Sequence, residues 1–123
     1  MKNITLFFFL AICTLSFSQE YTEKEINDLA RDMSASLENT KTMNSDIIIK
    51  RIYSSKRDII TVYEIPADME LSENNVKKER LEQLQAFGGD VFYNNKINLE
   101  LWFLKNNIMY KRVRINYYEL GPK

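Results

Sequence analysis

The chain has 123 residues, of which 17 are lysine or arginine and 17 are aspartate or glutamate, so its net charge is close to zero. A neutral chain exerts no long-range attraction on nucleic acid or on an anionic membrane. Histidine is absent and Cys13 is the single cysteine, which excludes a Ser-His-Asp triad, a Cys-His pair and the usual zinc or haem ligands. The three glycines are too few for a phosphate-binding loop. We therefore expect no cofactor, no metal site and no nucleic-acid partner.

The N-terminal segment has the pattern of a secretory leader. Lys2 precedes an apolar run over residues 4–17, and Ser16-Phe17-Ser18 places small residues at the positions that signal peptidase requires. The run is shorter than the roughly 20 residues of a membrane-spanning helix. We predict that residues 1–18 are a signal peptide. Residues 19–123 then form a single exported domain, periplasmic or secreted, with no membrane span after cleavage.

Cys13 leaves a second possibility for the leader. Leu10-Ala11-Ile12-Cys13 has the outline of a lipobox, which would anchor the protein through a lipid on Cys13. Ile12 stands where a small residue is required, and apolar residues continue past the cysteine. Removal of the leader is therefore the favoured prediction.

The rest of the chain is predicted to form two units, each a helix followed by a β-hairpin. The first helix, expected over residues 22–38, begins with a capping box in which the side chains of Thr22 and Glu25 each satisfy the backbone amide of the other. Its apolar stripe consists of Ile26, Leu29, Met33 and Leu37. Residues 46–65 are rich in β-branched and aromatic types on both sides of a polar centre at 54–58, which is typical of a hairpin.

The second unit starts at Ser72, a residue suited to cap a helix. Its apolar stripe consists of Val76, Leu81, Leu84 and Phe87, and Gly88-Gly89 is expected to end the helix. Residues 90–96 are expected to be irregular, and a second hairpin follows from residue 97 to about 118. Because both helices are amphipathic, we predict an α+β domain. The two αββ units would form a mainly antiparallel four-stranded sheet with two helices on one face.

Alternation within the second hairpin predicts its register. A three-residue loop, Lys105 to Asn107, keeps apolar residues opposite apolar residues, whereas two or four residues would not. The face toward the helices then carries the pairs Ile97–Ile115, Leu99–Val113, Leu101–Lys111 and Phe103–Met109. The other face carries Asn98–Arg114, the ion pair Glu100–Arg112 and the aromatic pair Trp102–Tyr110.

The single tryptophan, Trp102, thus falls on the face that should meet water. The first hairpin adds to this face, because its even-numbered positions carry Ile48, Ile52, Ile60 and Val62 while its odd positions are also apolar. Two short helices cannot cover both faces, so a large apolar outer surface is expected, and monomers rarely expose one without a use for it. The alternative is that loops 38–45 and 88–96 cover this face.

Paired carboxylates are the one catalytic device that the composition allows. Asp46, Asp58, Glu64 and Glu100 lie on or beside the predicted strands, and two of them across a cleft could hydrolyse an envelope glycan. No spacing selects a pair, so no catalytic residue is assigned and the protein is expected not to be an enzyme.

The element order, the leader and the hairpin sequences "DIIIKRIYSSKRDIITVYEI" and "INLELWFLKNNIMYKRVRI" resemble small exported proteins of Gram-negative bacteria that have no assigned function. The order is also similar to the tandem αββ units of β-lactamase-inhibitor-like proteins, which bind an enzyme across a sheet face. The resemblance implies a binding role, although the disulfide cysteines of the secreted inhibitors are missing here.

The favoured hypothesis is an exported, non-catalytic module that presents an exposed sheet face to a protein partner or to a second copy of itself. Aromatic and arginine side chains favour such a role. The predicted contact residues are Trp102, Tyr110, Arg112, Glu100, Ile52, Ile60 and Val62. The alternatives are the glycan hydrolase and a purely structural accessory protein of the envelope.

Overall fold

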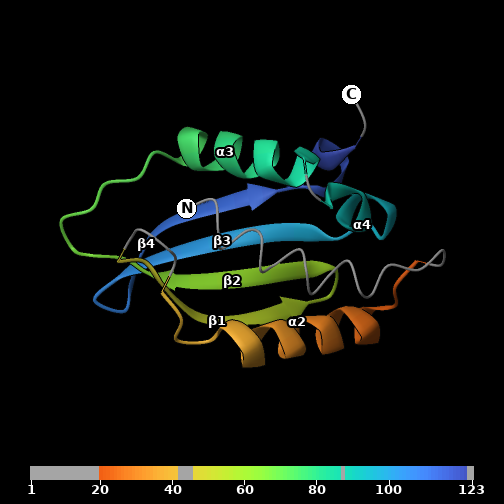
Figure 1. The fold of residues 1–123 in the computed structure, drawn as a ribbon, viewed down its shortest axis with the longest axis horizontal. Coiled ribbons are helices and arrows are strands. Elements are labelled where there is room, and N and C mark those ends of the chain that lie inside the picture. The colour runs from red at the N-terminus through yellow and green to blue at the C-terminus, as the bar shows by residue number, and fades with distance from the viewer. Residues whose placement is uncertain (1–19, 42–45, 87, 122–123) are drawn as a thin grey trace.

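The computed structural model describes residues 20–41, 46–86 and 88–121 (Figure 1). The predicted leader and the side chain of Phe87 lie outside these residues. In chain order the elements are α2 (Glu23–Leu37), β1 (Ile48–Ser55), β2 (Asp58–Glu64), α3 (Glu73–Ala86), α4 (Gly89–Asn94), β3 (Asn98–Lys105), β4 (Ile108–Ile115) and the 3-10 turn η1 (Tyr117–Leu120). The predicted α+β class and the αββ–αββ order are confirmed.

The four strands form one sheet in the order β1-β2-β3-β4. Each hairpin is antiparallel, whereas the central pair β2–β3 is parallel, with Asp58 opposite Asn98 and Glu64 opposite Leu104. Parallel neighbours need a long crossover connection, and the segment that contains α3 and α4 supplies it. Figure 1 shows α2 running beside β1 and α3 beside β4.

Local sequence signals fix the starts of both long helices. The amide of Glu25 donates to Thr22 Oγ1 at 3.2 Å and the amide of Thr22 donates to Glu25 Oε1 at 3.0 Å, which confirms the capping box. Ser72 caps α3 in the same way, because its hydroxyl oxygen accepts a hydrogen bond from the amide of Asn75 at 3.4 Å.

Residues 90–96 were expected to be irregular. This prediction is wrong, because most of them belong to α4. Gly88 adopts a left-handed conformation with φ of 76°, which ends α3 and lets the chain start a new helix at once. Phe92 then buries its whole ring against the core. The free energy gained by burying this one aromatic ring stabilises α4. The helix has six residues, which are too few for an apolar pattern to predict it.

One hydrophobic core lies between the helices and the sheet. The helices contribute Ile26, Leu29, Ala30, Met33, Leu84 and Phe92. The sheet side is formed by Ile47, Ile49, Ile52, Ile59, Tyr63, Ile65, Ile97, Leu99, Leu101, Phe103, Val113 and Ile115. Leu99, Leu101 and Phe103 of β3 face the core, as predicted. Within the described part of the chain, no helix is long and apolar enough to cross a membrane.

Candidate interaction face of the sheet

A β-bulge in β1 decides which residues reach the open face, the side of the sheet opposite the helices. The register with β2 shifts between Ile49 and Arg51, so Lys50 is an extra residue and the alternation reverses after it. Ile52 therefore lies in the core and is only 3 % exposed. The prediction that Ile52 lies on the outer face is wrong, because strict alternation cannot anticipate a bulge. Arg51 and Tyr53 lie on the open face instead.

The turn of the second hairpin also differs from the prediction. Lys105 pairs with Ile108, so the loop has two residues, Asn106 and Asn107, with φ of 52° and 64°. The predicted three-residue loop is wrong, because two asparagines accept the left-handed backbone of the tightest hairpin turns. A register shift further along β4 then makes Tyr110 an extra residue. Leu99 therefore pairs with Ile115 and Leu101 with Val113, and the predicted pairs Leu99–Val113, Leu101–Lys111 and Phe103–Met109 are wrong.

The bulge at Tyr110 removes this residue from the open face. Its hydroxyl accepts a hydrogen bond from the amide of Leu71 at 3.3 Å, and its ring packs against the core. The amine of Lys105 lies 3.8 Å from the ring centre. The predicted pairing of Tyr110 with Trp102 is therefore wrong, and Arg112 stands opposite Trp102 instead.

Trp102 finds its aromatic partner on β1, two strands away. Its ring meets the ring of Tyr53 edge-on, with centroids 6.0 Å apart. Since Tyr53 is paired with Ile60 and Trp102 with Val62, the two rings meet over β2. Ile60 and Val62 are accordingly only 6 % and 5 % exposed. The prediction of an exposed apolar outer surface is therefore wrong, because the aromatic pair covers these side chains within the domain.

The aromatic pair extends into a row that crosses the sheet, from Arg51 on β1 through Tyr53 and Trp102 to Arg112 on β4. The guanidinium carbon of Arg51 lies 4.7 Å from the centre of the Tyr53 ring, and that of Arg112 lies 5.0 Å from the Trp102 ring. Such contacts fix both the cations and the rings. We name these four residues the Arg-aromatic row.

Glu100 holds one end of this row. It is 7 % exposed and accepts hydrogen bonds from the indole of Trp102 at 2.7 Å, from Arg112 at 2.8 Å and from Arg114 at 2.7 Å. The predicted ion pair with Arg112 is confirmed, although Arg114 is the residue directly opposite in the ladder. Arg114 also bonds Asp58 at 3.0 Å, so the cluster joins three strands.

The pKa of Glu100 is set by two opposed causes. Burial by itself raises it, but the hydrogen bonds from Trp102, Arg112 and Arg114 outweigh burial and hold the pKa below its ordinary value. The pKa of Arg114 is raised, chiefly by its hydrogen bonds to Asp58. Glu100 therefore remains ionised at neutral pH, which suits a fixed anchor and not a proton donor.

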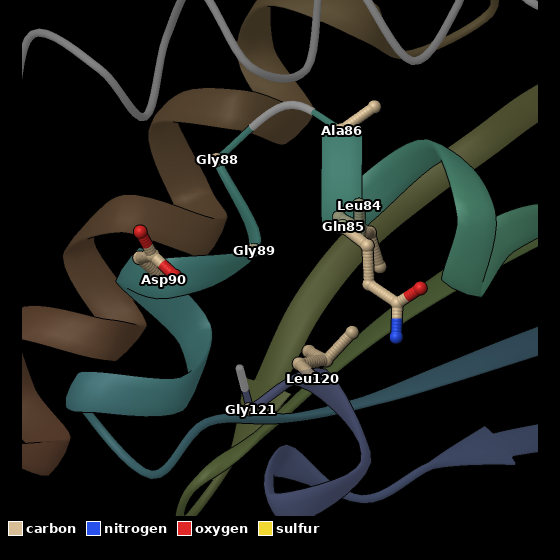
Figure 2. A pocket seen from close by; sticks show the side chains of 8 residues that line it. All are labelled: Leu84, Gln85, Ala86, Gly88, Gly89, Asp90, Leu120 and Gly121. Carbon is tan, nitrogen blue, oxygen red and sulfur yellow. The ribbon is translucent and has the colours of Figure 1, made fainter. Parts of the chain in front are cut away.

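Two hollows lie outside the Arg-aromatic row. One, of about 340 Å³, lies where the end of α3, the start of α4 and η1 meet (Figure 2). Its walls are largely backbone: a Cβ on Gly89 would come within 2.6 Å of the Leu84 carbonyl oxygen, so this is a close junction of two helices. Gln85 and Asp90 supply its only polar side chains among the described lining. Neither side chain makes it a chemical site.

The second hollow, of about 550 Å³, lies at the end of the sheet near the β1–β2 turn. Lys56, Arg57 and Lys96 line it together with Glu23 and Asp58. No group of three or more acidic, cysteine or histidine side chains that could hold a metal ion occurs in the described segments. The mixed charges of this hollow select no ligand.

Sequence comparisons leave the chain without a match, since neither a protein-family model nor a curated protein resembles it. Its fold does have relatives. A Pseudomonas aeruginosa protein described as secreted superposes with a TM-score of 0.64 at 11 % identity, covering 85 % of this chain and 100 % of that one. The pilotin of the Vibrio vulnificus type 2 secretion system superposes with a TM-score of 0.60 at 11 % identity, covering 82 % and 96 %.

The chain shares its fold with a pilotin. The expected resemblance to small exported proteins of Gram-negative bacteria is thus confirmed for the fold. At 11 % identity the likeness carries no residue across, so the roles of the Arg-aromatic row and of Glu100 rest on the geometry of this chain alone.

Proposed function

We propose that this protein is an exported, non-catalytic binding module of the Gram-negative envelope, and that its open sheet face binds a protein partner. The likeness to a secreted protein and to a pilotin of a type 2 secretion system supports this proposal and suggests an accessory role in protein secretion. In this proposal residues 1–18 are removed as a signal peptide.

The observation that carries the proposal is the Arg-aromatic row. Tryptophan, tyrosine and arginine are the side chains that contribute most to protein interfaces. Here the rings and guanidinium groups are already held in place by one another and by Glu100, so binding would order few side chains. Arg51 has no carboxylate partner among the described residues and lies exposed at one end of the row.

Glu20 and Tyr21 are held against the domain by Asn95 and Arg57. The amide of Tyr21 donates to Asn95 Oδ1 at 2.7 Å, and Arg57 donates to the Tyr21 carbonyl oxygen at 2.7 Å. Glu20 lies 3.5 Å from the same guanidinium group.

A glycan hydrolase is the weaker proposal. Asp58 and Glu100 do come together, since both bond to one nitrogen of Arg114. A glycosidase needs one carboxylic acid with a raised pKa, whereas the pKa of Glu100 is lowered by its three donors. The arginine between the carboxylates also occupies the place of a substrate.

Site-specific photo-crosslinking tests the proposed function. A photoreactive amino acid would replace Arg51 on the open face in the protein exported by a Gram-negative host, and Lys24 on the outer side of α2 would be the matched control position. We expect a discrete crosslinked protein from position 51 and none from position 24. Equal products from both positions, or none from position 51, would contradict the proposal.

The same samples separate a foreign partner from a second copy of the chain. Sedimentation of the purified protein at increasing concentration reports its oligomeric state. A product at twice the mass of the protein, together with a concentration-dependent dimer, would assign the face to self-association.

A further inference from the structure

Arg51 and Arg112 stand at the two ends of one rung of the sheet. Across the strands, Arg51 is paired with Val62, Val62 with Trp102, and Trp102 with Arg112. Neighbouring strands lie about 4.8 Å apart, so three strand spacings place the Cα atoms of the two arginines roughly 14 Å from each other. The open face therefore carries one guanidinium group on each of its two outer strands.

Both guanidinium groups have donors to spare. Arg51 is exposed, and among the described residues its guanidinium group contacts the ring of Tyr53 and forms no hydrogen bond. Arg112 is 57 % exposed and donates to Glu100 through Nη2 at 2.8 Å, while its Nε and Nη1 have no acceptor in the described part of the chain. Since a guanidinium group has five N–H donors, most of the donors of this pair are free.

The neighbouring Arg114 differs, because each of its nitrogens is already bonded. Its Nε donates to Asn116 Oδ1 at 2.9 Å, its Nη1 to Glu100 and to Asp58, and its Nη2 to Asp58 at 3.3 Å. Arg114 thus serves the domain itself and offers a partner little.

The acceptors of the open face are also in use. Its described strands carry three carboxylates, of which Glu100 accepts three hydrogen bonds and Asp58 is bonded by Arg114. Glu64 accepts a hydrogen bond from the amide of Asn106 at 2.8 Å, and its second oxygen is buried. Free donors therefore outnumber free acceptors on this face, and a partner that fits it must supply acceptors.

The kind of acceptor follows from the type and number of the free groups. A guanidinium group that is stacked on a ring presents a planar edge, which suits two parallel hydrogen bonds to one carboxylate. An anionic bilayer is attracted by clusters of four or more basic residues, whereas this face has two arginines with free donors among the described residues. The carboxylates of a protein fit this arrangement better than a lipid surface does.

We propose that the partner of the open face presents aspartate or glutamate side chains to Arg51 and Arg112, one carboxylate at each end of the Arg-aromatic row. This inference rests on the proposed function, because it names the chemistry of the partner that the face binds. Trp102 and Tyr53 would then meet the uncharged residues between the two carboxylates.

Nuclear magnetic resonance on the protein purified after export tests the proposal. The probe is the peptide acetyl-Glu-Val-Leu-Val-Glu-amide, whose glutamates lie roughly 13 Å apart in an extended chain. The control peptide has glutamine at both ends. The Nε–H signals of Arg51 and Arg112 should shift with the acidic peptide and not with the control. The Nε–H signal of Arg114 should stay in place, because this group is bonded to Asn116.

Variants at position 51 test the contribution of one end of the row. Arg51→Gln should weaken binding of the acidic peptide by about two- to fivefold, the size of one exposed ion pair. Arg51→Lys should bind with intermediate affinity, because lysine keeps the charge and loses the planar pair of donors. Lys78→Gln on the exposed side of α3 is the matched control and should leave the affinity unchanged.

Three results would overturn the proposal. Equal shifts with the acidic and the glutamine peptide would show that charge does not select the partner. Absence of shifts at Arg51 and Arg112 with millimolar acidic peptide would remove the carboxylate site. Shifts produced by phosphatidylglycerol vesicles and not by the peptide would assign the two arginines to an anionic membrane.

A second crosslinking position separates this inference from the proposed function. Ser55 is exposed on the same face of β1, so a photoreactive residue there leaves both arginines in place. A crosslinked protein from position 55 should decrease when Arg51→Glu is added. An undiminished product would overturn the acidic partner and leave the proposed function standing, whereas the absence of products from both positions 51 and 55 would overturn the proposed function.

Discussion

Trp102 and Glu100 lie on the same face of β3, and the indole N–H of Trp102 donates to Glu100 Oε1 at 2.7 Å. The contact explains why the single tryptophan can sit on the face away from the helices. Its ring covers β2 together with Tyr53, while its one polar atom is satisfied by a carboxylate two residues earlier. Tryptophan suits such a position because it is apolar over its ring and polar at one atom.

We predict that Trp102→Ala lowers the free energy of unfolding by about 2–3 kcal/mol, because it uncovers Ile60 and Val62 and removes a half-buried ring. Trp102→Phe should cost less, since a ring remains over β2. Urea denaturation followed by circular dichroism measures both. Tyr118→Ala, at a ring that is 65 % exposed, is the control and should change stability little. Equal losses at 102 and 118 would contradict the covering role.

Glu100→Gln should lower the free energy of unfolding by about 1–2 kcal/mol at pH 7, because the amide keeps the shape of the side chain and loses its charge-assisted bonds to two arginines. The control is Glu82→Gln on the exposed side of α3, which has no described ion pair and should leave stability unchanged. Chemical denaturation of both variants at pH 7 gives the comparison.

The cost of Glu100→Gln should depend on pH. The pKa of Glu100 is lower in the folded protein than its ordinary value of 4.5. A carboxyl group with a depressed folded pKa contributes stability above its unfolded pKa and loses it as the pH falls through the folded pKa. The difference between the wild type and the variant should therefore be full at pH 7 and shrink below pH 4.5. A difference that stays constant into acid would show that charge is not its cause.

Ile52→Ala should cost about 2–4 kcal/mol, because the bulge at Lys50 places this side chain in the core. Ile108→Ala removes the same atoms from a side chain that is 71 % exposed and should cost less than about 0.5 kcal/mol. The pair of variants tests the reversed alternation of β1 by urea denaturation. If both variants lose similarly little stability, Ile52 lies on the outer face and the reversed alternation is wrong.

The Asn106-Asn107 turn yields a fifth prediction. Both residues have left-handed backbone, so alanine at either position should cost about 1 kcal/mol, whereas glycine should be tolerated. Asn74→Ala in the first turn of α3, where the backbone is helical, is the control and should cost nothing. Thermal unfolding measures the order of the variants' stabilities. An alanine variant that is as stable as the glycine variant at the same position would contradict the two-residue turn.

Hydrophobic periodicity and helix caps predict much of the fold, because both depend on residues that are neighbours in the chain. The Thr22–Glu25 capping box, the Ser72 cap, the Gly88-Gly89 helix stop and the two hairpins are all local features, and the structure has each of them. The odd residues of β3 were also placed correctly, because no bulge interrupts the alternation there before Phe103.

The candidate site was predicted only in part. Glu100, Trp102 and Arg112 share the open face as predicted, because the shorter loop and the extra residue Tyr110 together restore the predicted alternation of faces. Arg51 and Tyr53 were missed. The polar Lys50 beside Arg51 is the only local hint of the bulge that brings them to the open face.

By itself, then, the sequence determined the two long helices, the hairpins and the exclusion of histidine, cysteine and phosphate-loop chemistry, because residue type and spacing decide these locally. Tertiary structure alone decided the two bulges, the parallel β2–β3 pairing, the burial of Phe92 in α4 and the meeting of Tyr53 with Trp102. Each depends on groups that are far apart in the chain. Their free energies arise only when the strands pair and the core closes, so no window of neighbouring residues contains them.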